Sequence, residues 1–226
     1  MRSYGQYCGL ARSLEVVGDR WNLLIVRQLL VGSARYRDLF EGLPGIATNL
    51  LADRLRDLEA SGVIERRLAD TGSVVEYALT PWGAELRQPI ESLIRWSTPL
   101  MVRGPEGDAF RLEWFALAVP ALLETRVKTR TSITVGLAVG GDVLLQLRAT
   151  RSGIEVGPHD GRELDATVRA EPMCVLGLAA GALSLDDAHA LGMIETDGDE
   201  SVVRTVFAAR ATSQIPIIVS SQPRAK

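Results

Sequence analysis

The sequence predicts an α+β protein with two domains, an N-terminal winged helix-turn-helix over residues 1–104 and a C-terminal domain of helices and antiparallel strands over residues 105–226. The first prediction rests on an amphipathic helix near Thr48–Ser61 that is followed directly by a basic β-hairpin. The second rests on the hydrophobic period, which changes to strict alternation from Ser132 onward. A Gly- and Pro-containing break at Gly104–Asp108 separates the two patterns.

The helix near Thr48–Ser61 has one apolar and one polar face. Leu51, Leu55 and Leu58 recur at i, i+4 and i+7, which places them on the same side of a helix. A Pro44-Gly45 turn precedes the helix and Gly62 ends it. We therefore expect the leucines to face a core and the opposite side to face outward. The outward residues are Thr48, Asn49, Ala52, Asp53 and Arg56.

Three further helices are expected before this one. Helical patterns cover Gln6–Val17 and Arg20–Leu30, and a short helix begins at Tyr36 after the stop at Gly32. The short helix, a tight turn and the helix near Thr48 have the order of a helix-turn-helix, in which the second helix enters the major groove of DNA.

A hairpin and one more helix complete the first domain. The hairpin pairs Val63–Leu68 with Val74–Leu79 through a turn at Asp70–Ser73. Thr80 is a good N-cap and Pro81 suits the first helical position, so a helix is expected to start there. Its apolar stripe is wide for a single helix, and part of it is suited to a partner subunit. The stripe consists of Leu86, Ile90, Leu93, Ile94 and Trp96.

Charge differs between the two halves. Residues 1–104 hold 13 Arg, no Lys and 12 acids, a net charge of +1, whereas residues 105–226 have a net charge of −4. Since the whole chain has a net charge of −3, basic groups that contact phosphate must be placed locally. The N-terminus has no signal-peptide core and no apolar run approaches about 18 residues, so we expect a cytoplasmic protein without membrane contact.

The outward face of the helix near Thr48 carries groups that suit DNA. Asn49 and Arg56 can hydrogen-bond base edges or phosphates. Asp53 repels phosphate unless its carboxylate accepts a hydrogen bond from cytosine or pairs with an arginine. Arg54 lies nearer the core edge, where an ion pair with an acid explains it as well as DNA does. Four arginines are candidates for phosphate contacts: Arg35, Arg37, Arg66 and Arg67. For each of them, the alternative is that the side chain is only part of a solvated surface.

The second domain is predicted to begin with a helix at Arg111–Glu124 and to continue as a sheet flanked by helices. The strand patterns cover Ser132–Val139, Val143–Ala149, Ile154–Val156, Ala166–Ala170 and, later, Met193–Thr196. The helical patterns that flank the last strand cover Pro172–Gly181, Ser184–Leu191 and Asp199–Ala209.

Five motifs follow one another in the first domain. They are C-x5-L-x3-G-x-x-W from Cys8 to Trp21, G-x-x-R-Y-x-D-L-x-x-x-L-P-G-I from Gly32 to Ile46, L-x-x-R-L-x-x-L from Leu51 to Leu58, G-V-I-x-R from Gly62 to Arg66, and V-E-Y-x-L-T-x-x-G from Val75 to Gly83. In order and spacing they resemble the motifs of the HxlR family of winged-helix transcription regulators. The resemblance covers residues 8 to about 100 and implies a homodimer that binds an inverted repeat of double-stranded DNA.

The chain departs from the family's usual pattern at three places. It has Asp19-Arg20 before the tryptophan where the family has Gly-Lys, Gly9 after the cysteine where the family has Pro, and Ala47 near the start of the outward-facing helix where the family has Ser. The last change weakens the N-cap of that helix, although Thr48 could substitute.

The second domain resembles the sterol carrier protein fold over about Leu112–Ala209. The segments that carry the likeness are Asp165–Pro172, Leu178–Ala188 and Ile194–Asp199. The resemblance implies an apolar cavity between sheet and helices that could hold a lipid-like effector. Ordinary core packing is the alternative for each lining candidate. The candidates are Trp114, Phe115, Leu178 and Met193.

Cys8 resembles the N-terminal cysteine that many HxlR-family members use as a redox or electrophile sensor. Arg12, one helical turn later, could lower the pKa of its thiol. The alternative is a small, buried apolar side chain, since cysteine is among the most buried residue types.

The sequence contains no catalytic or metal-binding pattern. His159 and His189 are the only histidines, and Cys8 and Cys174 are far apart in the sequence, so neither a metal site nor a cofactor is expected. We therefore expect a transcriptional regulator that is not an enzyme. A carrier of lipid-like ligands, or an enzyme acting on lipid or acyl substrates, is the alternative.

Overall fold

The computed structural model describes residues 3–69, 72, 74–101, 104–127, 129–141 and 143–208. Of the predicted hairpin turn, Asp70, Thr71 and Ser73 lie outside the described residues. The chain divides into two compact units, one up to Ile90 and one from Glu91 onward.

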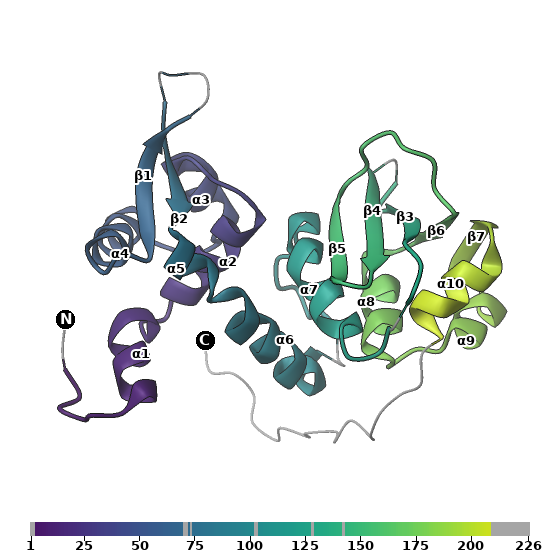
Figure 1. Cartoon of the computed structure of the whole chain (residues 1–226), viewed down its shortest axis with the longest axis horizontal. Helices are drawn as coiled ribbons and strands as arrows, with labels where there is room; N and C mark the ends of the chain where they lie inside the picture. Colours follow the sequence, from purple (N-terminus) through teal and green to yellow (C-terminus); the bar gives the residue numbers. More distant parts are fainter. Residues whose placement is uncertain are drawn as a thin grey trace. The chain divides into compact units, whose positions relative to one another are not determined.

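The first unit has the elements of a winged helix-turn-helix in the predicted order (Figure 1). The elements are α1 (Gly9–Val17), α2 (Asn22–Val31), α3 (Tyr36–Gly42), α4 (Thr48–Ala60), β1 (Ile64–Leu68), β2 (Val75–Leu79), α5 (Pro81–Ala84) and α6 (Arg87–Met101), of which α6 continues into the second unit.

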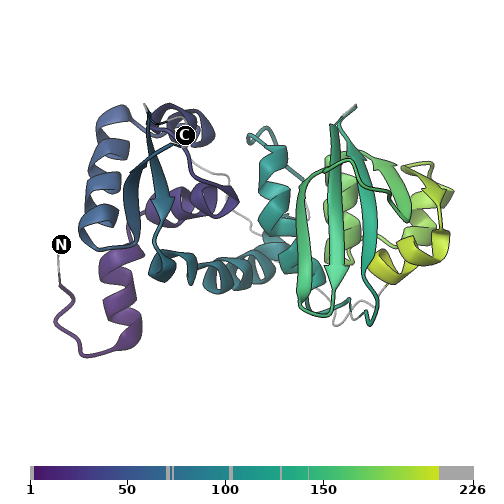
Figure 2. The ribbon, with the colours of Figure 1, turned by 45° about the horizontal axis from the view of Figure 1, so that its top comes forward.

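The leucine face of α4 is buried as the sequence predicts. Leu51, Leu55 and Leu58 are excluded from solvent, and α4 packs against β1, beside which it lies in Figures 1 and 2. Burying a leucine side chain stabilises a fold by about 1.5–3 kcal/mol relative to leaving it exposed. These three contacts therefore set the rotation of α4 about its axis, and with it the residues that α4 turns outward.

The β-hairpin is extended by a contact that the sequence did not reveal. Strands β1 and β2 pair antiparallel from Ile64–Leu79 to Leu68–Val75. On the other side of β2, Ala34 and Tyr77 exchange two backbone hydrogen bonds, with N···O distances of 3.0 and 2.8 Å. A bridge of one residue has no hydrophobic period, and it ties the loop before α3 to the hairpin.

The helix expected after the hairpin is two helices, α5 and α6. Thr80 caps α5, because its Oγ1 accepts a hydrogen bond from the backbone N–H of Gly83 at 3.0 Å. The expectation of one helix through this segment was wrong. Pro89 has no N–H to donate to the carbonyl of Glu85, so the hydrogen-bond ladder of one continuous helix is interrupted there.

The C-terminal part of α6 packs with the second unit. The Arg95 guanidinium donates to the carbonyl of Ala121 at 3.2 Å and pairs with Glu124 at 2.9 Å. The division between the units therefore falls inside α6, before the predicted domain boundary between residues 104 and 105, which stays a prediction.

The second unit is a five-stranded sheet with helices packed on one face (Figure 2). Its strands lie in the order β5-β4-β3-β6-β7, and the β3–β6 pair alone is parallel among them. The strands are β3 (Ile133–Val139), β4 (Val143–Thr150), β5 (Gly153–Pro158), β6 (Ala166–Ala170) and β7 (Ile194–Gly198). The helices are the short 3-10 helix η1 (Leu112–Trp114), α7 (Phe115–Leu123), α8 (Pro172–Ala180), α9 (Leu185–Ala190) and α10 (Glu200–Phe207).

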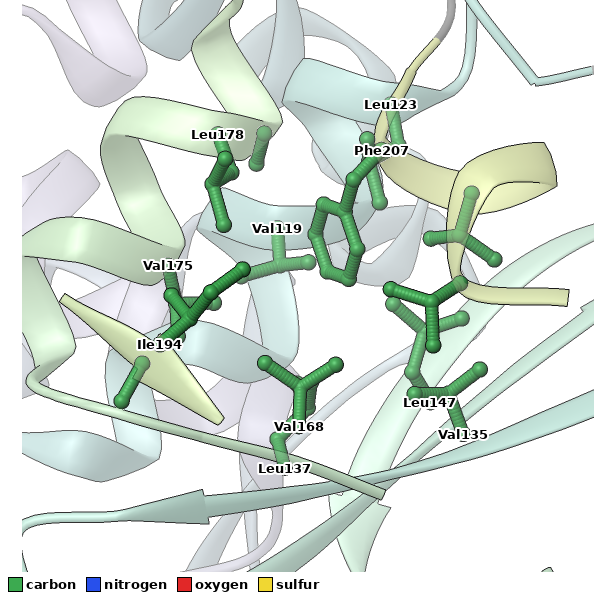
Figure 3. Close-up of a cluster of buried hydrophobic side chains, with 14 of the residues drawn as sticks. Val119, Leu123, Val135, Leu137, Leu147, Val168, Val175, Leu178, Ile194 and Phe207 are labelled. Atoms are coloured by element: carbon green, nitrogen blue, oxygen red, sulfur yellow. The ribbon is translucent and has the colours of Figure 1, made fainter. Parts of the chain in front are cut away.

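The core of the second unit lies between the sheet and its helices. Alternate residues of β3, Val135 and Leu137 among them, point into it and meet Val119 of α7, Leu178 of α8 and Phe207 of α10 (Figure 3). The alternating apolar residues of β3 and the helically spaced apolar residues of α7 and α10 thus form one continuous apolar cluster.

Helix α8 ends on a long-range polar contact. Gly181 adopts a left-handed conformation with φ of 72°, which ends the helix. The guanidinium of Arg126 donates to the carbonyls of Leu178 and Ala179 at 3.0 and 2.5 Å. Burial lowers the pKa of Arg126. An arginine that follows α7 therefore satisfies the last carbonyl groups of α8.

Gly83→Ala should destabilise the first unit. A Cβ at Gly83 would overlap the backbone carbonyl of Val63, which cannot rotate away as a side chain would. We expect the free energy of unfolding to fall by about 1–3 kcal/mol. Gly9→Ala is the matched control, because a Cβ there meets no atom within 4 Å. Urea unfolding followed by circular dichroism measures both variants, and an equal response would contradict the close-contact explanation.

Candidate nucleic-acid interface

The outward face of α4 has the composition expected from the sequence. Thr48, Asn49 and Arg56 are exposed, while Ala52 and Asp53 are half-buried. The hydroxyl of Tyr36 donates to the carbonyl of Thr48 at 2.7 Å, which fixes the start of α3 against the start of α4. The helix-turn-helix therefore presents these five side chains on one surface opposite the buried leucines.

The first turn of α4 has no side-chain cap. Its N-cap residue is Ala47, and Thr48 is already the first helical residue, so the expectation that Thr48 could serve as the cap was wrong. A side chain inside the helix is not placed to accept from the N–H groups of its own first turn in the way an N-cap residue does. Those N–H groups consequently have no side-chain acceptor within the helix.

Asp53 and Arg56 form an ion pair on the outward face. The Nη2 of Arg56 lies 2.6 Å from Oδ1 of Asp53, and the two side chains are 71% and 50% exposed. The sequence left open whether Asp53 would repel phosphate or pair with an arginine. Its carboxylate pairs with Arg56 in the structure.

Arg54 takes the structural role that the sequence allowed for it. Its guanidinium pairs with Asp19, in the turn after α1, and lies 3.3 Å from Asp57 of α4. Only 20% of its side chain is exposed. Sequence reasoning did not identify Asp19, because an ion pair between residues 35 positions apart has no local pattern.

The four phosphate candidates differ in how their charge is balanced. Arg37 pairs with Glu41 at 2.7 Å and Arg66 pairs with Glu59 at 2.8 Å, and these carboxylates raise the pKa of each guanidinium. Arg35 lies 3.9 Å from Glu76.

Arg67 of β1 is exposed and forms no ion pair with any described residue. Exposed pairs such as those of Arg37 and Arg66 are weak, because water and salt screen them, so these arginines can exchange a carboxylate for a phosphate. Arg67 can contact phosphate without breaking an ion pair to any residue that the structure describes.

Cys8 is exposed at the start of α1, and the alternative of a buried apolar side chain was therefore wrong. The backbone N–H groups of Ala11 and Leu10 lower the pKa of its thiol by hydrogen bonding to the thiolate. The expected cause, Arg12, was wrong, since Arg12 pairs with Glu15 at 2.9 Å. The first turn of α1 favours the thiolate in the way that helix N-termini do.

The four candidates for a ligand pocket do not share one environment. Phe115 and Leu178 are fully buried members of the core cluster, and Leu178 lies among its side chains in Figure 3. Trp114 is half-buried and makes an edge contact with Phe110 at 6.1 Å between ring centroids. Met193 is 43% exposed just before β7. Ordinary core packing accounts for Phe115 and Leu178.

The described residues also bear on metal sites and on membrane-spanning helices. Across the described parts of the chain, no three His, Cys, Asp or Glu side chains are grouped so that they could hold a metal ion. No helix among the described residues is both long and apolar enough to cross a bilayer.

Cys8 should be the fast-reacting thiol of the folded protein. Its lowered pKa predicts that the alkylation rate by iodoacetamide reaches its plateau at a lower pH than in the urea-unfolded chain. Cys174 should react slowly, because it is buried and burial raises the pKa of its thiol. Mass spectrometry of the labelled protein separates the two sites, with Cys8→Ser as the control that removes the fast phase. A Cys8 plateau at the same pH in folded and unfolded chains would contradict the prediction.

The chain is similar to known proteins over its N-terminal part. Residues 16–104 match the HxlR-like helix-turn-helix family. The HTH-type transcriptional regulators YvaP and YodB of Bacillus subtilis (strain 168) are each 34% identical over 88 and 86 residues, which are 38% of this chain and 82% and 77% of theirs. The solved structure of reduced YodB shares 31% identity, with a TM-score of 0.38 over 44% of this chain and 99% of that one. The chain belongs to the HxlR-like helix-turn-helix family of transcriptional regulators.

Proposed function

We propose that this regulator binds an inverted-repeat operator in double-stranded DNA as a homodimer, and that it acts in the cytoplasm. The observation that carries the proposal is the outward face of α4, which places Asn49 and Arg56 opposite the buried leucines, next to a hairpin with the exposed Arg67. In a winged helix-turn-helix these are the recognition helix and the wing.

The proposed contacts divide into base-reading and phosphate contacts. Asn49 and Arg56 read base edges in the major groove, with Thr48 and Ala52 on the same face of α4. The basic residues that flank α4 contact phosphates and set the register of the protein on the duplex. They are Arg35, Arg37, Arg66 and Arg67.

The homodimer is supported by apolar side chains that each unit leaves exposed. Helix α6 exposes Leu93, Trp96 and Leu100, with Trp96 at 74%. Of the predicted stripe, Leu93 and Trp96 are therefore exposed, whereas Ile90 is buried and Leu86 and Ile94 are half-buried. Helix α1 exposes Leu10 and Leu14. Exposed apolar faces on amphipathic helices are the usual surfaces of helix pairing between subunits. A two-fold dimer then presents two α4 helices to successive major grooves.

Substitutions at Asn49 and Arg67 should have different effects on DNA binding. Asn49→Ala should reduce the preference for the operator over unrelated DNA by about 5- to 100-fold, the usual range for a base contact. Arg67→Ala should weaken binding to all sequences alike and reduce the salt slope by about 1. Mobility shifts on the upstream region of the protein's own gene at several salt concentrations measure both. Unchanged affinity and salt slope in Arg67→Ala would show that the wing does not contact the backbone.

The same mobility-shift assay separates a DNA-binding regulator from the two alternative functions, a carrier and an enzyme. If the wild-type protein binds no DNA at low salt, a carrier of lipid-like ligands or an enzyme acting on lipid or acyl substrates becomes the better interpretation.

We also propose that Cys8 is a redox switch, supported by its exposure and its lowered pKa. Mild oxidation should change the DNA affinity of the wild type and not that of Cys8→Ser, and equal responses would remove Cys8 from this role.

For the second unit we propose a sterol-carrier-like domain, with its boundary after residue 104, that binds an apolar effector. The order of its elements supports this proposal: a helix, the strands β3 to β6, two helices, a strand and a helix. The core between sheet and helices is where such a ligand would bind, next to Trp114, Phe115, Leu178 and Met193. To regulate DNA binding, the ligand must bind one arrangement of the dimer more tightly than another. A ligand with equal affinity for two arrangements does not shift the equilibrium between them.

An apolar effector should be found by mass and by its effect on operator binding. Native mass spectrometry of the purified protein should show a retained ligand, and one member of a panel of fatty acids and sterols should change affinity for a fluorescent operator. No bound mass and no change in operator affinity across the panel would leave the second unit as a structural element.

A further inference from the structure

The Asp53–Arg56 pair lies on the outward face of the recognition helix, where most DNA-binding surfaces avoid a carboxylate. We propose that Asp53 determines specificity by holding Arg56 toward a guanine while it accepts a hydrogen bond from the amino group of a cytosine in the neighbouring base pair. The inference rests on the proposed DNA binding and names the bases that this part of α4 reads.

The geometry of the pair suits two neighbouring base pairs. Asp53 and Arg56 are three residues apart, which is a rise of about 4.5 Å along a helix, and neighbouring base pairs are stacked about 3.4 Å apart. The ion pair joins Nη2 of Arg56 to Oδ1 of Asp53 at 2.6 Å. A guanidinium has five N–H donors, so donors remain for the O6 and N7 atoms of guanine. Asp53 therefore positions Arg56 without using up its ability to bind a base.

The chemistry of the carboxylate selects cytosine for the second base. An ionised carboxylate only accepts hydrogen bonds, and it is repelled by phosphate oxygens. In the major groove guanine presents only acceptors, thymine an acceptor and a methyl group, and adenine an amino group with the N7 acceptor beside it. Cytosine presents its amino group alone. Asp53 is thus satisfied by cytosine and penalises other sequences, which lowers binding to unrelated DNA.

The other acids near the interface are placed differently. Asp57 also lies on α4, but it faces Arg54, whose guanidinium is held by Asp19. Glu59 pairs with Arg66 and Glu41 with Arg37, so both accompany phosphate candidates. Asp57→Asn removes the same charge from the same helix without touching Arg56, which makes it the matched control for Asp53→Asn.

The experiment selects bound sequences from a random pool of double-stranded DNA with the full-length protein. The selected duplex and an unrelated duplex are then used to measure affinities at two salt concentrations. The wild-type motif should contain adjacent cytosine and guanine in each half-site. Asp53→Asn should lose the cytosine preference and lower the ratio of selected to unrelated affinity about tenfold. Asp57→Asn should keep the motif and most of the ratio.

The outcomes separate this inference from the function it rests on. Absence of wild-type binding to either duplex at low salt would overturn the proposed function itself. Wild-type binding with a motif that lacks the adjacent cytosine and guanine would overturn the role of Asp53 without any variant. The role is also overturned if Asp53→Asn keeps the wild-type motif and ratio, or if Asp57→Asn alters them equally. Asp53→Ala, checked for folding by circular dichroism, should repeat the loss of cytosine preference.

Discussion

The burial of three leucines on one side of α4 is the constraint on which the rest of the first unit depends. Leu51, Leu55 and Leu58 are buried and fix the rotation of the helix about its axis. Side chains on the opposite face of the helix must therefore point outward. Removing one such leucine side chain costs a fold about 2–5 kcal/mol, far more than any exposed ion pair contributes. The orientation of the outward face of α4 is therefore set by packing, and the charged side chains on that face do not determine it.

The charges of that surface are largely balanced within the protein. Arg37, Arg56 and Arg66 each have an acid at hydrogen-bond distance. This balance agrees with a chain whose net charge is −3, because long-range attraction to DNA is small and short-range contacts must decide where the protein stays.

Periodicity was enough to predict most helices and strands, including α4, the hairpin and β3, since each has a clear repeat of 3.6 or 2. Contacts between distant residues could not be predicted. The Ala34–Tyr77 bridge and the Arg54–Asp19 pair join positions that have no pattern in common. The same holds for the parallel pairing of β3 with β6, two strands that are separated in the sequence by β4 and β5.

At the candidate site, the residue types were predicted more reliably than their partners. The outward face of α4 followed from the leucine spacing, whereas the partner of each arginine depended on side-chain positions in three dimensions. Cys8 illustrates the difference. Its position at a helix start could be read approximately, but the neighbouring Arg12 was assigned to it when the true effect comes from backbone N–H groups of the first helical turn.

The contact between Arg126 and the end of α8 links two positions in a way that matters for how the sequence can change. Gly181 has a positive φ, and a Cβ there would lie 2.9 Å from the guanidinium carbon of Arg126. A larger residue at 181 would have to adopt this left-handed conformation and would displace the Arg126 guanidinium, so that the carbonyls of Leu178 and Ala179 would lose their donor. Natural variation at these two sites should be coupled, although they are far apart in the sequence and neither belongs to the outward face of α4.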